Sequence, residues 1–177
     1  FLLAYTVSAL KVIKEYEKIV VFTLGRADGV KGPGLQFVWP IFQQSKKVDL
    51  RIMTMPIPMQ EIITKDNVTV GVDAVVYLRV IDSAKAILET TNYVYATSQF
   101  AQAALRDVAG NADMDELLSK RDQISQQIKE IVDAETDKWG IDVENVKIQN
   151  IELPQDMKRA MAKQAEAVVH RAHEELE

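Results

Sequence analysis

The chain has 177 residues, a net charge of −5, 47% apolar and 27% charged residues, and no cysteine. Its length and its proportions of apolar and charged residues fit one globular domain with appendages. Its net negative charge excludes the global basic field that would hold nucleic acid. The absence of cysteine excludes disulfides, thiolate zinc sites and a cysteine nucleophile.

The first ten residues, FLLAYTVSAL, are almost entirely apolar. They are far fewer than the ~20 residues that a helix needs to cross a bilayer. Two interpretations stay open. The segment either packs on the domain as a short strand or helix, or it is the end of a membrane segment, because Lys11 and Lys14 follow it as lysines follow membrane ends.

The next part of the chain predicts strands. Residues 19–24 are a continuous apolar run typical of a buried strand, and the glycine-rich residues 25–34 predict turns. The two prolines within residues 53–58 predict a sheet edge or an irregular crossing. Residues 68–80 alternate strictly between two faces and are the clearest strand. Asp66-Asn67 predicts the hairpin turn that precedes it.

Helical patterns follow the long strand. Asp82 can cap a short helix that runs to Leu88. From Tyr93 onward, apolar residues recur at helical spacing and predict a second helix. Gly110-Asn111 is expected to end that helix, since both residues favour helix C-termini.

A third helical pattern starts at Asp113, which with Glu116 resembles a capping box. One apolar stripe runs from there to Trp139, and Gly140 is expected just beyond the end of the helix. In the return strand, residues 141–153, the apolar phase changes twice, which predicts bulges. The order of elements along the chain predicts an α+β fold, because strands come first, helices follow and one strand closes the domain.

Pro154 ends the return strand and fits the first turn of a last, highly charged helix. Asp156 lies near the positive end of the dipole of this helix. Small and apolar residues recur along it with an 11-residue period, which produces a nearly straight seam. A narrow seam cannot bury itself alone and predicts self-association. The expected oligomerisation residues are Met157, Met161, Ala165, Val168 and Ala172.

Four stretches, in the right order, resemble the stomatin (slipin) branch of the SPFH, or band 7, superfamily. The first is GPGLQF at residues 32–37 with VDLR at 48–51, and the second is TKDNVTV at 64–70. The third runs from Arg121 to Ile141. The fourth is Leu153-Pro154 followed by RAMA at 159–162 and QAEA at 164–167. The resemblance covers residues 16–167.

This resemblance implies an α+β SPFH domain over residues 16–153, with a bent, mostly antiparallel sheet and packed helices. It implies that residues 1–15 are the membrane-proximal remnant of an N-terminal hydrophobic anchor. Residues 154–177 would then be the start of a long, coiled-coil-like C-terminal helix that drives oligomerisation.

The function implied by the resemblance is a membrane-associated oligomeric scaffold that organises membrane microdomains and modulates client membrane proteins. The alternative is a regulator or substrate-presenting partner of a membrane protease, without a lipid-organising role. The expected partners are further copies of the chain, the lipid bilayer and a membrane protease or other client, and no nucleic acid. The expected location is the plasma membrane, at its cytoplasmic face.

Three aromatic residues lie within six positions, beside Pro40 and close to several lysines. Aromatic side chains often anchor cores. Alternatively, this loop places its apolar side chains in the membrane interface while the lysines meet headgroups, and the resemblance favours this second interpretation. The expected membrane contacts are Phe1, Leu2, Leu3, Phe37, Trp39, Pro40 and Phe42.

No combination of residues predicts catalysis. The two histidines, His170 and His173, lie on the last helix, where a solvated surface is a better interpretation than a metal site. Residues 25–34 lack the spacing and the lysine of a phosphate-binding loop. No serine lies in a Gly-x-Ser-x-Gly elbow. We therefore expect no enzymatic activity, no metal and no cofactor.

Overall fold

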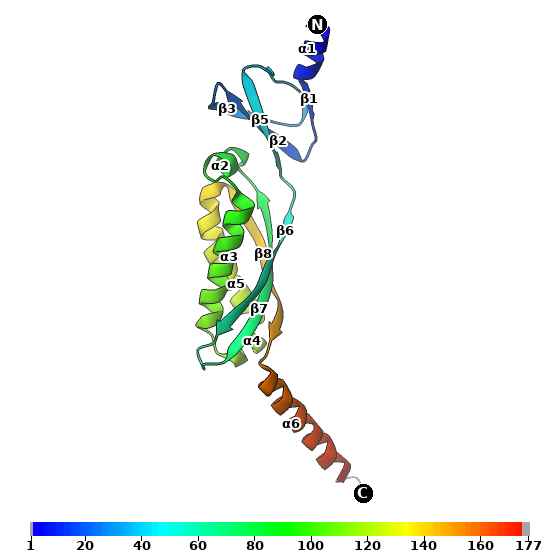
Figure 1. Ribbon diagram of the computed structural model, residues 1–177, viewed down its shortest axis with the longest axis vertical. Coiled ribbons are helices and arrows are strands. Elements are labelled where there is room, and N and C mark those ends of the chain that lie inside the picture. The colour runs from blue at the N-terminus through cyan, green and yellow to red at the C-terminus, as the bar shows by residue number, and fades with distance from the viewer. Residues whose placement is uncertain (1, 175–177) are drawn as a thin grey trace.

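The computed structural model describes the backbone of residues 2–174 and the side chains of residues 3–171. The molecule is elongated, with the N-terminal helix at one end and the C-terminal helix at the other (Figure 1). Between them lie a small β-part, residues 10–49, and a larger α+β part, residues 53–152. The strand pairs of the described residues are all antiparallel.

The small β-part contains two sheets, one of β1 and β4 and one in the order β3-β2-β5. Its elements are α1 (Leu2–Ala9), β1 (Leu10–Ile13), β2 (Glu17–Thr23), β3 (Arg26–Lys31), β4 (Gly34–Phe37) and β5 (Gln43–Asp49). Ile13, Ile19, Val21 and Val38 form its buried cluster. Residues 10–13, which the expected boundary at residue 16 leaves outside the domain, are thus a paired strand of the fold.

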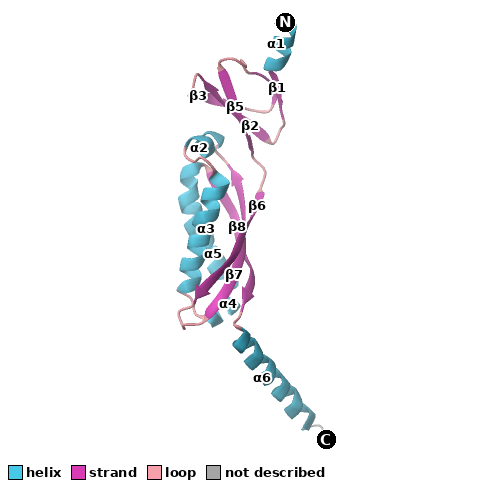
Figure 2. Ribbon diagram, viewed as in Figure 1, coloured by secondary structure: helices cyan, strands magenta, loops and turns pink. Residues whose placement is uncertain are grey.

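The larger part is a three-stranded sheet in the order β6-β7-β8, with α3 and α5 packed on one face (Figure 2). Its strands are β6 (Met53–Ile63), β7 (Thr69–Val80) and β8 (Ile141–Glu152). Its helices are α2 (Ser83–Leu88), α3 (Tyr93–Gly110), α4 (Met114–Ser119), α5 (Arg121–Thr136) and the 3₁₀ turn η1 (Asp137–Trp139). The predicted α+β class is confirmed, although the strands form three sheets rather than one.

The main core lies between this sheet and its helices, where the even-numbered residues of β7 are all buried. The predicted hairpin before β7 is also present. Asn67 has a φ of 68°, and Asp66 accepts hydrogen bonds from the Thr64 hydroxyl and, at 3.3 Å, from the backbone N–H of Met114. The Thr64 hydrogen bond, opposed by partial desolvation, lowers the pKa of Asp66. The carboxylate thereby ties the turn to α4.

The irregularities of the sheet follow the sequence pattern. β6 is an edge strand, and its register with β7 shifts between Ile57 and Gln60, beside the two prolines. The pairing of β8 with β7 shifts twice, between Val72 and Ala74 and between Tyr77 and Leu78. The two predicted bulges of the return strand are therefore confirmed.

The helices agree with the pattern except in one region. Asp82 caps α2 by accepting the N–H of Lys85 at 3.1 Å, and α3 ends at Gly110. The apolar stripe after Asp113 is divided between two helices, because Lys120 has φ −114° and ψ 39°, outside the helical region. Ile131, expected on that stripe, is exposed.

Gly140 connects α5 and η1 to β8 and adopts the left-handed conformation, with φ 67°. Its carbonyl accepts the backbone N–H groups of Ile81 and Asp82 at 2.9 and 3.0 Å. A Cβ atom at this position would lie 2.5 Å from the carbonyl oxygen of Asp82. The predicted helix-terminating glycine is therefore confirmed, and its backbone approaches α2 too closely for any side chain.

A small buried cluster joins the β-part to the larger part. It consists of Val48 on β5, Val80 on β7 and Ala86 on α2. Beside it, the Arg51 guanidinium stacks on the Tyr16 ring at 4.0 Å and pairs with Asp49 at 2.7 Å. The hydrogen bonds from Arg51 hold the pKa of the Asp49 carboxyl below its usual value.

Helix α6 (Gln155–Glu174) leaves the end of the larger part that lies away from the N-terminus (Figure 1). The Pro154 carbonyl accepts the Lys158 N–H at 3.0 Å, so the proline stands one position before the helix rather than within its first turn. Asp156 is in the first turn, as predicted. All side chains from Lys158 to Arg171 are exposed.

Candidate membrane-contact surface

The aromatic residues expected to contact a membrane are open to solvent. Phe37 is 42%, Trp39 49% and Phe42 54% exposed, and Pro40 is also exposed. Val38 enters the core instead, with 2% exposure, and its N–H donates to the Ala9 carbonyl at 2.9 Å. These aromatic side chains therefore do not anchor the core, which removes the first of their two interpretations.

The β1–β4 ladder presents an apolar face to solvent. Its register pairs Leu10 with Phe37 and Val12 with Leu35. Alternation along a strand places these four side chains on one face of the ladder, and all four are exposed. The other face contributes Ile13 to the core. An apolar cluster of this kind on a folded surface marks a contact site for a partner or a membrane.

The loop after β4 continues this apolar face. The Trp39 ring packs edge-on against Phe37, with 5.5 Å between ring centroids. The backbone of Phe42 then accepts the N–H of Leu24 at 3.0 Å. Leu24 is 80% exposed and has a φ of 49°, a conformation that is uncommon for residues other than glycine or asparagine. An exposed leucine in this turn contributes little to the fold.

These exposed apolar side chains all lie at the N-terminal end of the molecule and are called here the N-terminal apolar surface. It comprises Leu3, Val7, Leu10, Val12, Leu24, Leu35, Phe37, Trp39, Ile41 and Phe42. Phe1 and the side chain of Leu2, expected in the same surface, lie outside the described residues. The period-two alternation at residues 10–12 and 35–37 is the signal that could have added Leu10, Val12 and Leu35 to the prediction.

The same end of the molecule is basic although the chain is acidic. Residues 1–52 contain eight Lys and Arg residues and four Asp and Glu residues, whereas the net charge of the whole chain is −5. Lys31 donates to the carbonyl of Phe37 at 2.6 Å, so its ammonium group lies beside the aromatic loop. Lysines beside an apolar surface suit the region where lipid tails meet headgroups.

The expected oligomerisation residues lie along α6. Met157 is half-buried near the start of the helix, whereas Met161, Ala165 and Val168 are exposed. The side chain of Ala172 lies outside the described residues. Val169, which the predicted seam omits, lines a shallow apolar depression with Ala165. The seam is thus accessible on a helix that projects from the domain.

Other chemistry weighed from the sequence has a plain structural account. Residues 26–31 are strand β3, so the glycine-rich segment forms a hairpin and turns. Within residues 3–171, no group of three or more His, Cys, Asp or Glu side chains is placed to hold a metal ion. His170 is exposed on α6, and the side chain of His173 is not among those described. None of the described helices combines the length and apolarity needed to cross a bilayer.

Known proteins resemble this chain over nearly its whole length. Residues 11–177 match the SPFH domain / Band 7 family. A stomatin homolog of Pyrococcus abyssi is 54% identical over 94% of the chain, and mouse stomatin is 44% identical over 89%. The chain spans 62% of the length of the Pyrococcus protein and 56% of mouse stomatin. The chain therefore belongs to the SPFH domain / Band 7 family and is a stomatin-type member of it.

Proposed function

We propose that the chain is the membrane-proximal portion of an oligomeric scaffold that organises a patch of membrane and modulates client membrane proteins. The observation that carries this proposal is the exposed apolar face of the β1–β4 ladder, continued by Trp39. This face has no role in the core, and basic residues accompany it. The role is architectural and needs no catalytic group.

The shape of the molecule supports different roles for its two ends, membrane contact at one and association between copies at the other. The N-terminal apolar surface lies at one end of the long axis and α6 leaves the other end (Figure 1). With the N-terminal end in contact with a bilayer, α6 points away from it, where helices of neighbouring copies can associate side by side. Membrane binding raises the effective concentration of these helices, so weak helix contacts sum to a stable assembly.

The similarity to stomatins supports placing the scaffold at the cytoplasmic face of the plasma membrane, with a client membrane protein as partner. The alternative is a regulator of a membrane protease that acts without organising lipid. Flotation of the chain with phosphatidylcholine vesicles separates the two. The scaffold proposal expects the chain to float with the vesicles. A chain that stays in the lower fractions at all lipid concentrations would contradict it and leave the protease regulator.

Assembly is expected to depend on the exposed seam of α6. Ala165→Glu and Val168→Glu place like charges opposite each other in neighbouring helices and keep helix propensity similar. Light scattering over a concentration series should show a smaller mass for both variants than for the parent. High salt should partly restore the mass by screening the charges. Since α6 has only 20 residues and short helices associate weakly, we expect dimers or trimers of the parent.

Lys163→Gln is the matched control for this experiment. It changes the net charge by the same amount but lies on the opposite side of the helix from the seam, at 100° per residue. It should keep the mass of the parent. Equal masses for the parent and both glutamate variants at every concentration would mean that the SPFH domain itself supplies the contacts between copies.

A further inference from the structure

An open groove of about 290 Å³ lies between the last turn of α3 and the first turns of α5, and α4 also lines it. Its floor is apolar and is formed by three buried residues, Val108, Ala112 and Ile124. Its walls are polar and consist of Asp107, Asn111, Glu116, Lys120, Gln123 and Gln127. The wall residues of α3 are four positions apart, as are those of α5, so each pair lies on the side of its helix that faces this one space.

The groove lies in a strongly acidic part of the chain. Residues 93–137 contain nine Asp and Glu residues and four Lys and Arg residues. In the groove, Glu116 and Lys120 lie 4.0 Å apart and offset each other, whereas Asp107 has no ion pair among the described residues. The carbonyl end of α3 adds partial negative charge beside Asp107, and Asp122 in the first turn of α5 offsets the positive end of that helix. The groove therefore favours a cation.

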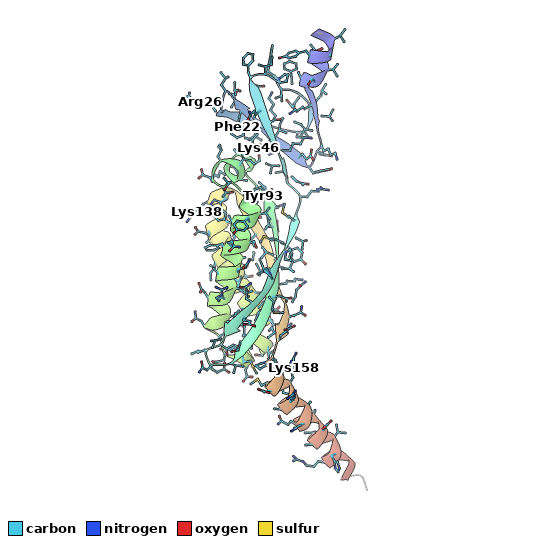
Figure 3. All side chains as sticks on the ribbon, viewed as in Figure 1. Phe22, Arg26, Lys46, Tyr93, Lys138 and Lys158 are labelled. Atoms are coloured by element: carbon cyan, nitrogen blue, oxygen red, sulfur yellow. The ribbon has the colours of Figure 1, made fainter. Side chains whose placement is uncertain are left out.

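The start of α6 carries the opposite charge. Residues 155–165 contain three Lys and Arg residues and one Asp. The side chains of Lys158, Arg159 and Lys163 are exposed and make no ion pair within the part of the chain that the structure describes. Figure 3 labels Lys158 where α6 leaves the larger part, and α4 lies at this same end (Figure 1). The acidic groove and the basic start of α6 thus belong to one end of the larger part.

In the proposed scaffold, copies contact the bilayer with their N-terminal ends and stand side by side. This arrangement places the start of one α6 at the same distance from the bilayer as the groove of the next copy. Arg159 suits the groove because its planar guanidinium can pair with the Asp107 carboxylate and donate to the amide oxygens of Asn111 and Gln123. We propose that the groove receives Arg159 of a neighbouring copy, an inference that rests on the proposed self-association.

This contact differs from the seam contact of α6. Arg159 lies two residues before Met161 and therefore about 160° away from it around the helix, at 100° per residue. One α6 can thus use its seam and its basic side at the same time. The groove contact joins two different surfaces, so each copy offers a groove to one neighbour and an arginine to another. Contacts of this heterologous kind can continue from copy to copy and build assemblies larger than a dimer.

The absence of cysteine from the whole chain allows a site-specific cross-linking test. One variant, the groove chain, carries Gln123→Cys on the groove wall. The other, the helix chain, carries Ala162→Cys, about one turn beyond Arg159 on α6. The two chains are mixed in equal amounts and treated with a short bismaleimide. In the control, Ser125→Cys replaces Gln123→Cys, because Ser125 lies on the other side of α5, beside β8.

We expect the groove chain and the helix chain to form a covalent dimer, and the control chain to form little. Asp107→Arg in the groove chain, or Arg159→Glu in the helix chain, should slow cross-linking about fivefold, because an attractive pair becomes repulsive. Combining the two reversals, one in each chain, should restore the rate. Lys163→Glu makes the same charge change one turn further from the groove and should have little effect.

The two charge reversals should not disturb the fold. Asp107→Arg adds a positive charge to the last turn of α3, and Arg159→Glu adds a negative charge near the start of α6. Each new charge is favourable at its end of the helix dipole. Thermal melting of the variants checks that the fold is retained, so that a slower reaction reports the contact between copies.

Other outcomes separate the failure of the groove contact from the failure of self-association. Unchanged rates in both charge variants would overturn the groove contact, as would slower rates that the combined reversal does not restore. Cross-linking lost in Val168→Glu but kept in the charge variants would mean that the chains meet through the seam alone. A parent that does not cross-link but has an oligomeric mass in light scattering would remove the groove contact only. A monomeric parent would remove both proposals.

Discussion

Replacing Phe37, Trp39 and Phe42 with serine is expected to weaken binding to phospholipid vesicles by at least a factor of about one hundred. The three rings are about half exposed, so each would leave water on binding and contribute about 1–2 kcal/mol. Their combined loss of about 3–6 kcal/mol corresponds to about two to four orders of magnitude in the binding constant. Flotation over a series of lipid concentrations measures this change.

The stability of the same variant distinguishes a contact surface from a structural loop. Phe37 and Trp39 pack edge-on against each other, and none of the three rings belongs to a buried cluster, so the free energy of unfolding should fall by only about 1 kcal/mol. A matched variant replaces three exposed apolar residues outside the N-terminal end, Ile63, Leu118 and Ile131, with serine. It should bind vesicles like the parent. Equal losses in both variants would contradict a localised surface.

Gly140→Ala is expected to lower the free energy of unfolding by about 2–4 kcal/mol. The residue has a φ of 67°, and its Cβ would approach the Asp82 carbonyl oxygen to 2.5 Å. Relief of this overlap requires α2 to move away from the start of β8. That movement would break the hydrogen bonds from Ile81 and Asp82 to the Gly140 carbonyl. Chemical denaturation of parent and variant gives the difference directly.

Gly32→Ala is the control, since its Cβ meets nothing within 4 Å and the residue has no positive φ. It should change the free energy of unfolding by less than about 0.5 kcal/mol, as most surface substitutions do. A Gly140→Ala variant as stable as this control would show that the junction of α2 and β8 is looser than the structure indicates.

Local rules account for the elements that the sequence predicted well. The Asp66-Asn67 turn, the alternation of β7, the Asp82 cap and the glycine after η1 each depend on residues adjacent in the chain. Their backbone preferences act over a few positions. For this reason the α+β order of strands and helices could be read without tertiary information. Two of the four stretches that resemble stomatins, residues 64–70 and 121–141, include such local segments.

The break at Lys120 shows where local rules stop. Nothing in its identity disfavours a helix, and lysine is a good helix former. The division into α4 and α5 instead follows from packing, since Leu117 and Ile124 are buried in the same core from two different helices. Similarly, Ile131 has the spacing of a core residue but is exposed and lies outside the buried cluster that contains Ile128 and Val132.

Tertiary structure decided how far the candidate membrane surface extends beyond the predicted aromatic loop. Leu10 and Val12 alternate with Lys11 in the sequence, a pattern that local rules interpret as a half-buried strand. β1 pairs with β4, more than 20 residues away, and no other described element covers the apolar face of that pair. The sequence by itself determined which residues are apolar or charged and which secondary structure they form. Tertiary structure decided which of them stay uncovered, because exposure depends on long-range partners that no local pattern specifies.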